Sequence, residues 1–567
     1  MRSIHPRSVL ALAPLSLALL AATPPALAQA PAPPAERPPD VFGEVIDVRV
    51  VNVEVVVTDR DGNRVTGLGP GDFRLTIDGE PVTIDYFSEV VGGVARRPAD
   101  AAVAAAPGAG DGTVGTSYLV YVDDTFTIAR DRDKVLRALA DDLDFLGPGD
   151  RVAVVAFDGR KVDMLTSWSD DPAALRGALR AAELRPTRGL TRLAERRSHD
   201  MVLVGELANR GIALLTELGP EDRFFAQQVA RQVETAVSGS VAALRGFAQP
   251  PGRKVMLLLA GGWPFSPATY AADVRSAVID PAVPEGAELL RPLVDTANLL
   301  GYTIYPVDVP GLGGGGGTDV EIGSLGAVPV EPGADPTVGV SSTSPIGSLV
   351  RESNAEDSLS YLAGATGGRP LINARRLAVL QHVSEDTRSY YWLGFSPERQ
   401  GDDRRHDIRV EVTRPGLRAR SRDSFRDLSR EAERQMAVES ALLFGEPAAE
   451  GLLPVRVGEA TPAGRRHVEV PIEIAIPVDF VTLLPTGELD HWTVRLEVRL
   501  AALDERQRQS PVPAVPIEIT LAGRPDPGKY IPYQTRLKMR RAEQVLVVSV
   551  TDAASGQSLT ARVPVKP

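Results

Sequence analysis

The stretch YLVYVDDTFT, residues 118–127, decides the fold class of this chain. Its first five residues, Tyr118 to Val122, are apolar and form a short buried strand, and a polar loop follows at once. Behind that loop, apolar side chains recur at helical spacing at Val135, Leu139 and Leu143. A short apolar strand that leads through a polar loop into a helix is the opening unit of an α/β fold.

The same pattern continues along the chain. Further apolar strands are expected at 151–157 (RVAVVAF), 254–259 (KVMLLL) and 302–307 (YTIYPV), and residues 161–165 should return as an antiparallel edge strand. Helices are expected between them, one opening at Asp171-Pro172 and others across 207–247 and before Leu300. Strands that alternate with helices imply right-handed crossovers and a mainly parallel sheet with helices on both faces.

Strand-like sequence flanks this α/β region on both sides. Residues 47–59 alternate like a half-buried strand, and Asp61-Gly62 and Asp78-Gly79 mark tight hairpin turns. Towards the other end, runs such as HVEVPIEIAI and WTVRLEVRL are separated by turn residues at short intervals, which is typical of a β-sandwich. We therefore predict a multidomain α/β plus β chain, in which a central doubly wound, mainly parallel sheet is flanked by a small all-β module and a C-terminal β-sandwich.

The predicted boundaries follow the composition. A chain of 567 residues is too long for one hydrophobic core, so several units are expected. They are a signal peptide at 1–28, a Pro/Ala-rich tether at 29–40, the N-terminal β module at 41–95, a linker at 96–116, the α/β domain at 117–395 with a flexible Gly/Ser/Pro insertion at 311–348, a β-hairpin extension at 396–430, and the sandwich at 440–567.

The N-terminus predicts export. Arg2 and Arg7 precede an apolar run from Val9 to Ala22, and Ala26-Leu27-Ala28 follows, which together describe a secretory signal peptide. The run is shorter than the roughly 20 residues that span a bilayer, so no transmembrane segment is expected. We predict cleavage after Ala28 and a secreted or periplasmic mature protein.

Several function classes are disfavoured by composition and motifs. A formal charge of −12 without a basic cluster argues against nucleic-acid binding. The absence of cysteine excludes a disulfide scaffold and a thiol-linked lipoprotein. The sequence has neither G-x-S-x-G nor H-E-x-x-H, and its six histidines are scattered. We therefore do not expect an enzyme.

Four segments carry a resemblance to a known family. They are VTGLGPGDFRLTIDGEPVTI (65–84), YLVYVDDTFT (118–127), GRKVMLLL (252–259) with its later partner YTIYPVD (302–308), and DSLSYLAGATGG (357–368) followed by SYYWLGFSP (389–397). The α/β region resembles von Willebrand factor A-type (VWA) domains, and the whole chain resembles exported bacterial proteins of the VWFA-related, acidobacterial-type family. The resemblance covers residues 45–425.

VWA domains commonly bind partners through a metal-ion-dependent adhesion site at the carboxyl edge of the sheet. Its motif is D-x-[ST]-x-[ST], then a threonine in a later loop, then an aspartate after a central strand. The resemblance therefore implies a site for Mg²⁺, or else Mn²⁺ or Ca²⁺, with the ligands Asp123, Thr125, Thr127 and Thr191. Thr187 is a nearby rival for the last position.

The third part of the motif departs from the family. The resemblance places the aspartate after KVMLLL, but that position is Gly261. A hard cation needs about six oxygen ligands, and a missing carboxylate weakens its charge compensation. Asp124 is open to two interpretations, either as a substitute ligand or as a side chain that points away or caps the following helix.

Two functional hypotheses follow, with a third ranked below them. The first is an exported, non-enzymatic protein-binding or adhesion protein that uses a VWA domain with a degenerate metal site. The second is a metal-independent structural or assembly module that binds through its β domains. A secreted hydrolase is ranked last. A protein ligand is expected, and the sequence does not name it.

Overall fold

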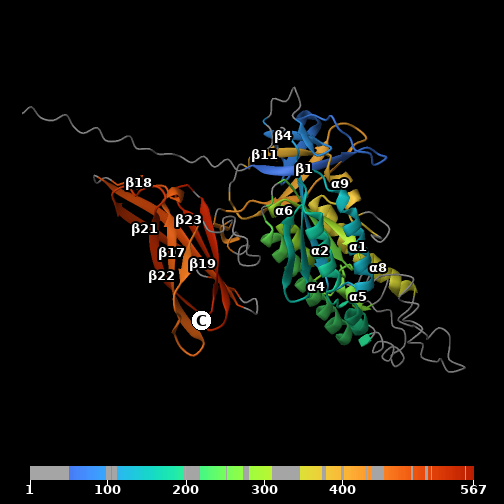
Figure 1. The fold of residues 1–567 in the computed structure, drawn as a ribbon. Coiled ribbons are helices and arrows are strands. Elements are labelled where there is room, and N and C mark those ends of the chain that lie inside the picture. Colours follow the sequence, from blue (N-terminus) through green and yellow to red (C-terminus); the bar gives the residue numbers. More distant parts are fainter. Residues whose placement is uncertain are drawn as a thin grey trace, which may run out of the picture. The chain divides into compact units, whose positions relative to one another are not determined.

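A computed structural model describes the chain from residue 50 onwards, with gaps (Figure 1). The described residues are 50–96, 104, 112–196, 198–199, 218–248, 250, 252–272, 280–309, 345–372, 379–397, 401–429, 431–432, 434–436, 438, 453–486, 490–504, 509–511, 514–555 and 557–566. The predicted signal peptide and tether lie outside them, as do most of the linker and most of the 311–348 insertion. Within this part of the chain, no helix is long and apolar enough to cross a membrane.

The predicted α/β region contains one five-stranded sheet. Its strands are β6 (Thr116–Asp123), β7 (Arg151–Phe157), β8 (Val162–Ser169), β9 (Arg253–Ala260) and β10 (Tyr302–Asp308). Their order is β10-β9-β6-β7-β8, and every neighbouring pair is parallel except β7 with β8. Every residue of β6 is buried, as expected for a central strand covered on both faces.

Helices cover both faces of this sheet (Figure 1). Alternate residues of β6 divide between two cores, Leu119 and Tyr121 on one face, Tyr118 and Val120 on the other. The first face packs against α4 (Pro220–Gly246), α5 (Pro267–Ala272), α6 (Gly286–Leu300) and α8 (Pro345–Thr366). The second packs against α1 (Ala129–Asp141), α2 (Pro172–Glu183) and α9 (Val379–Thr387), and the 3-10 helix η2 (Asp142–Phe145) follows α1.

Local sequence explains the helix starts. Asp171 caps α2 by accepting hydrogen bonds from the backbone N–H groups of Ala173 and Ala174, and Pro172 occupies the first turn. Within the predicted helical stretch 207–247, α4 begins at Pro220, and Gly219 is its N-cap residue. Helix α8 begins at Pro345, so the end of the predicted flexible insertion is helical.

The N-terminal β region is completed by strands from far along the chain. One sheet has the order β13-β1-β11-β4-β5, formed by β1 (Val51–Thr58), β4 (Tyr86–Val91), β5 (Val94–Arg96), β11 (Tyr390–Phe395) and β13 (Arg418–Arg420). A second sheet has the order β14-β12-β2-β3, formed by β2 (Phe73–Ile77), β3 (Glu80–Val82), β12 (Arg405–Val412) and β14 (Ser424–Arg426), with the 3-10 helix η1 (Pro70–Asp72) before β2. Both sheets contribute to one apolar core.

Two boundary predictions differ from this arrangement. The sequence placed 390–395 in the α/β domain, whereas β11 pairs with β1 and β4. It also predicted a hairpin within 396–430, whereas β12 pairs with β2 and β14 and β13 pairs with β1. All six residues of β11 are buried, so its apolar run looks like a strand of a parallel sheet and carries no information about its partner.

The C-terminal region contains two antiparallel sheets. The first is formed by β15 (Val455–Val457), β16 (Thr461–Pro462), β17 (His467–Pro477) and β22 (Tyr530–Arg540). The second is formed by β18 (Leu484–Pro485), β19 (His491–Asp504), β20 (Gln509–Pro511), β21 (Val515–Ala522), β23 (Gln544–Asp552) and β24 (Ser558–Val565), and η4 (Val478–Phe480) follows β17. Inward residues such as Ile472 and Val498 share one core. The predicted mixture of α/β and β regions is confirmed.

Candidate functional site

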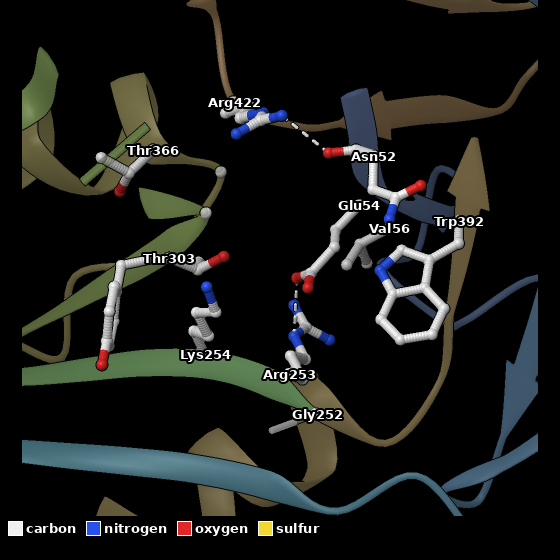
Figure 2. Close-up of a pocket in the computed structure, with 13 residues that line it drawn as sticks. Asn52, Glu54, Val56, Gly252, Arg253, Lys254, Thr303, Thr366, Trp392 and Arg422 are labelled. Atoms are coloured by element: carbon white, nitrogen blue, oxygen red, sulfur yellow. Dashed lines mark hydrogen bonds and ion pairs between the residues drawn. The ribbon is translucent and has the colours of Figure 1, made fainter. Parts of the chain in front are cut away.

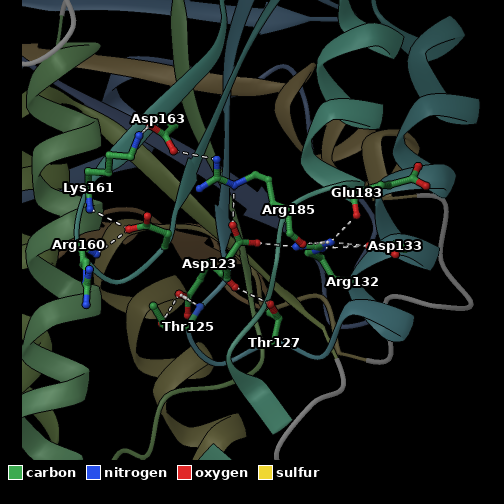
Figure 3. Close-up of polar contacts among 12 residues, drawn as sticks. Asp123, Thr125, Thr127, Arg132, Asp133, Arg160, Lys161, Asp163, Glu183 and Arg185 are labelled. Carbon is green, nitrogen blue, oxygen red and sulfur yellow. Dashed lines mark hydrogen bonds and ion pairs between the residues drawn. The ribbon is translucent and has the colours of Figure 1, made fainter. Parts of the chain in front are cut away.

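The predicted motif lies where β6 ends. Asp123 is the last residue of that strand, and Thr125 and Thr127 follow in the loop to α1 (Figure 3). The carboxyl ends of β6, β7, β9 and β10 meet at this edge because the four strands are parallel. Open α/β sheets generally place their ligands at such an edge.

The carboxylate of Asp123 is fully buried, and each of its oxygens accepts at least one hydrogen bond. Its Oδ1 accepts from the backbone N–H of Thr125 at 2.9 Å and from the Thr125 hydroxyl, and its Oδ2 accepts from the indole Nε1–H of Trp263 at 2.8 Å. Burial raises the pKa of the Asp123 carboxyl above its ordinary value, and the hydrogen bonds from Thr125 and Trp263 offset part of that rise. Both carboxylate oxygens therefore already have protein donors.

Thr127 turns back towards the strand. Its hydroxyl donates to the backbone carbonyl of Asp123 at 2.7 Å, and Thr127 itself is fully buried (Figure 3). This bond closes the turn between β6 and α1 and uses the hydroxyl proton. The threonine thereby fixes the path of the loop.

Asp124 points away from Asp123 into a buried ion-pair network. Its Oδ1 lies 2.7 Å from Nη1 of Arg132, and its Oδ2 lies 2.7 Å from Nε of Arg185. The side chains of Asp124 and Arg132 are both 0% exposed. Arg132 also donates to the backbone carbonyls of Glu183 (2.8 Å) and Arg185 (3.0 Å). Asp124 thus joins α1 to the segment after α2, and both of its oxygens are neutralised by arginine.

The loop that carries the later threonine packs against this edge through its backbone. The N–H of Arg188 donates to the carbonyl of Asp124 at 2.7 Å, and the N–H of Gly189 donates to the carbonyl of Thr127 at 3.0 Å. A Cβ at Gly189 would lie 2.4 Å from that same carbonyl, so the close approach requires glycine. The first three predicted ligands and this loop therefore converge.

Thr191 itself stands apart from the aspartate. It is exposed, in the helical residues 189–196, and none of the hydrogen bonds recorded among the described residues joins it to Asp123. Its rival Thr187 is half-buried in the loop before that helix. The loop reaches the edge, but the Thr191 hydroxyl is not held against the carboxylate.

Gly261 occupies the position where the sequence resemblance placed an aspartate, and it has no room for a side chain. A Cβ there would lie 2.1 Å from the carbonyl oxygen of Phe126 and 3.4 Å from that of Val309. Two residues later, Trp263 is 1% exposed and sends its indole N–H to Asp123. The segment after β9 thus supplies a neutral hydrogen-bond donor where the motif would supply a carboxylate.

These residues do not fit a divalent cation as they stand. A hard cation needs several free oxygen ligands around one point, but the Asp123 oxygens are occupied and Asp124 is paired with arginine. Among the described residues, no group of three or more His, Cys, Asp or Glu side chains is arranged to hold a metal ion.

Basic side chains line the outer side of the same edge. A hollow of about 240 Å³ is bordered by Thr125, Gly159, Arg192, Gln228, Arg231, Gln232 and Thr235. Arg192 is held by Glu195, with Nη1 3.0 Å from Oε2, and Arg231 is exposed on α4. None of the described residues that border this hollow is acidic. Its chemistry suits a carboxylate better than a cation.

A second polar cluster was not found from the sequence. Glu54, Arg253, Lys254 and Arg422 line a cavity near the amino ends of β9 and β10 (Figure 2). In the sequence, Glu54 is one polar residue of an alternating strand, and Arg253-Lys254 looks like a charged lead into the apolar β9. The one sequence signal for this cluster is the adjacent pair of cations, Arg253 and Lys254, just before a buried strand.

The sequence matches no protein-family model and no curated protein. Among solved structures, it is similar to the vWF domain of the type V pili tip protein Mfa5 from Porphyromonas gingivalis, with 13% identity, 48% of this chain and 94% of that chain covered, and a TM-score of 0.21. It is also similar to a von Willebrand factor type A structure from Catenulispora acidiphila, with 11% identity and a TM-score of 0.20. That match covers 87% of this chain and 73% of the other. Likenesses this distant carry no weight for how this chain works.

Proposed function

We propose that this chain is an exported, non-enzymatic binding protein whose α/β domain is of the VWA type and binds a protein partner without a metal ion. In this proposal the domain is the doubly wound unit of a multidomain protein, and the two C-terminal sheets form its β-sandwich. The strand order β10-β9-β6-β7-β8, with β8 as an antiparallel edge, and the Asp-x-Thr-x-Thr motif at the end of β6 support the VWA assignment.

One observation carries the metal-free part of the proposal. Asp123, the first residue of the motif, has one oxygen bonded to Thr125 and the other to the indole of Trp263. A cation that displaced the Trp263 hydrogen bond from this carboxylate would leave the buried indole N–H unsatisfied, which costs about 1–3 kcal/mol. The site is thus already closed by hydrogen bonds within the chain.

The arginines at the outer side of the edge suggest how a partner is held. An acidic side chain of a partner would meet Arg192 and Arg231 directly, where a metal-dependent adhesion site presents a cation. Guanidinium groups pair with carboxylates through two parallel hydrogen bonds, which adds geometric specificity to charge. The partner proposed here is therefore a protein with an exposed aspartate or glutamate.

Two of the described histidines lie beside carboxylates. His406 lies between two carboxylates, with Nδ1 2.8 Å from Asp78 and Nε2 3.2 Å from Asp402. His199 is buried, stacks on Phe225 and lies 3.1 Å from Asp222. Both imidazoles are thus paired with carboxylates within the fold.

An adhesion assay tests the proposal. Beads coated with the full chain are mixed with cells or envelope fractions of the organism that makes it, with and without EDTA. We expect adhesion that EDTA leaves unchanged and that Arg231→Glu reduces, whereas Lys538→Glu, the same charge change on an exposed residue of β22, has no effect. Adhesion abolished by EDTA would contradict metal independence, and no adhesion in either condition would contradict the binding role.

Export has its own test. N-terminal sequencing of protein isolated from that organism should begin at Gln29 in a periplasmic or secreted fraction. Protein that retains Met1 in the cytosol would refute export.

A further inference from the structure

The cavity lined by Glu54, Arg253, Lys254 and Arg422 has the features of a ligand site. It measures about 150 Å³ and lies where β1 passes the amino ends of β9 and β10 (Figure 2). Figure 2 shows Arg253 and Lys254 entering from one side and Arg422 from the opposite side. The four charged residues of the cavity thus come from three separate parts of the chain.

Its charges do not cancel. Three cations, Arg253, Lys254 and Arg422, share the cavity wall with a single carboxylate, Glu54, which leaves a net charge of +2. Arg253 is 1% exposed, and its Nε lies 2.8 Å from Oε2 of Glu54 as an ion pair without hydrogen-bond geometry. The one available carboxylate is therefore already committed to Arg253.

Backbone carbonyls hold the cations in place without neutralising them. Lys254 Nζ donates to the carbonyls of Ala248 (3.1 Å) and Leu300 (2.8 Å). Arg422 donates to the carbonyl of Asn52 at 2.7 Å and to that of Asn298. The guanidinium of Arg253 lies 4.3 Å from the centre of the Tyr390 ring. These contacts fix the positions of the three charges before any ligand arrives.

Hydrogen-bonding capacity remains unused around the cavity. The Nε atom of Arg422 is buried and has no hydrogen-bond acceptor among the described residues, whereas the Nε atom of Arg253 faces the Glu54 carboxylate. Burial lowers the pKa of Lys254 to about 8 and that of Arg422 to about 10, although the nearby Glu54 carboxylate opposes both shifts. An excess of buried positive charge is costly unless an anion compensates it.

We propose that this cavity binds a doubly charged oxyanion, either inorganic phosphate or the phosphate group of a small molecule. Two negative charges balance the net +2 of the wall, and several oxygens around one centre can accept from N–H groups that converge from opposite sides. A bound dianion would join β1, β9 and the segment before β14 through the same ion. The site is distinct from the edge at Asp123 and does not depend on the proposed partner binding.

Thermal unfolding of the full chain in different sodium salts at constant ionic strength tests the proposal. Inorganic phosphate should raise the Tm saturably, because a ligand that binds only the folded state stabilises it. Sulfate, which carries the same charge, should act similarly, whereas acetate and chloride should not. A phosphate shift equal to the chloride shift would overturn the proposal, and a response to acetate as strong as that to phosphate would overturn the assignment to a dianion.

Two cavity variants should shift phosphate affinity in opposite directions. Lys254→Met removes one cation and should raise the dissociation constant for phosphate at least about tenfold. Glu54→Gln removes the one carboxylate, raises the net charge to +3 and should tighten phosphate binding by a similar factor. Lys538→Met removes the same charge as Lys254→Met from the exposed face of β22 and should leave affinity unchanged.

The Lys538→Met control separates a local site from a general charge effect, because a general effect would weaken phosphate binding in both lysine variants. Lys254 also holds two backbone carbonyls, so Lys254→Met can fail to fold, and in that case Glu54→Gln decides. Tighter phosphate binding by Glu54→Gln supports the site. Unchanged or weaker binding by Glu54→Gln overturns it, as does a Lys538→Met variant that loses affinity as much as Lys254→Met.

Discussion

Replacing Trp263 by phenylalanine should weaken the α/β sheet by removing one hydrogen bond to a buried carboxylate. The indole N–H lies 2.8 Å from Oδ2 of Asp123, and both side chains are essentially inaccessible. A hydrogen bond to a charged group contributes about 1.5–3 kcal/mol, and the smaller phenylalanine ring adds a packing loss. The two contributions must be separated, because only the hydrogen bond bears on the site.

A double-mutant cycle with Asp123→Ala makes that separation. The packing loss of Trp263→Phe is present in both backgrounds and cancels, so the coupling between the two residues should be about 2 kcal/mol. Trp168→Phe is the matched control, because Trp168 packs against the same core, with its ring 5.4 Å from that of Phe247. Its cycle with Asp123→Ala should give no coupling.

Amide hydrogen exchange of β6 peptides in the full chain is the suitable assay. It reports the opening free energy of this sheet alone, whereas global unfolding of a multidomain chain mixes several transitions. Coupling below about 0.5 kcal/mol would mean that the two residues act independently and would refute the closed site. Equal coupling for Trp168 and Trp263 would refute it as well.

Three further predictions follow from the same contacts. Gly261→Ala should destabilise the α/β domain by at least about 1–3 kcal/mol in amide hydrogen exchange of β6 peptides, because its Cβ would press on a backbone carbonyl that cannot move freely, and a stable variant would contradict the close approach. Arg132→Met should cost about 3–5 kcal/mol by the same measurement because it leaves Asp124 buried with one partner lost, and a cost under 1 kcal/mol would contradict the network. Burial lowers the pKa of His406, but the two carboxylates beside it raise that pKa above its ordinary value overall, so the stability that protonated His406 contributes is full below pH 6.5 and is lost as the pH rises through the folded pKa. His406→Ala should therefore lose more stability at pH 5 than at pH 9 in thermal unfolding, and an equal loss at both pH values would contradict the pairing.

Strand and helix content could be predicted because the α/β region follows simple rules. The short apolar runs predicted as strands form β6, β7, β9 and β10, and turn residues and proline lie at the ends of helices. The partner of β11 could not be predicted, because a fully buried strand shows no alternation that would identify a face or a neighbour. Pairing across more than three hundred residues leaves no local trace in a single sequence.

The candidate site was predictable in place but not in chemistry. Asp123, Thr125 and Thr127 could be placed at the end of β6, because they directly follow the apolar run that forms this strand. The role of Trp263 depends on the path of the chain after Gly261, which is set by a close backbone approach that the sequence does not show. The pairing of Asp124 with arginines on α1 and after α2 is likewise a product of packing.

Calorimetric titration of the full chain with Mg²⁺ and Mn²⁺, repeated on Asp123→Ala, tests the central claim most directly. The Asp123 carboxylate is satisfied by Thr125 and Trp263, so we predict no saturable binding at millimolar metal and no difference between the two proteins. Saturable binding by the parent chain that disappears in Asp123→Ala would contradict the account and restore a metal-dependent adhesion site at this edge.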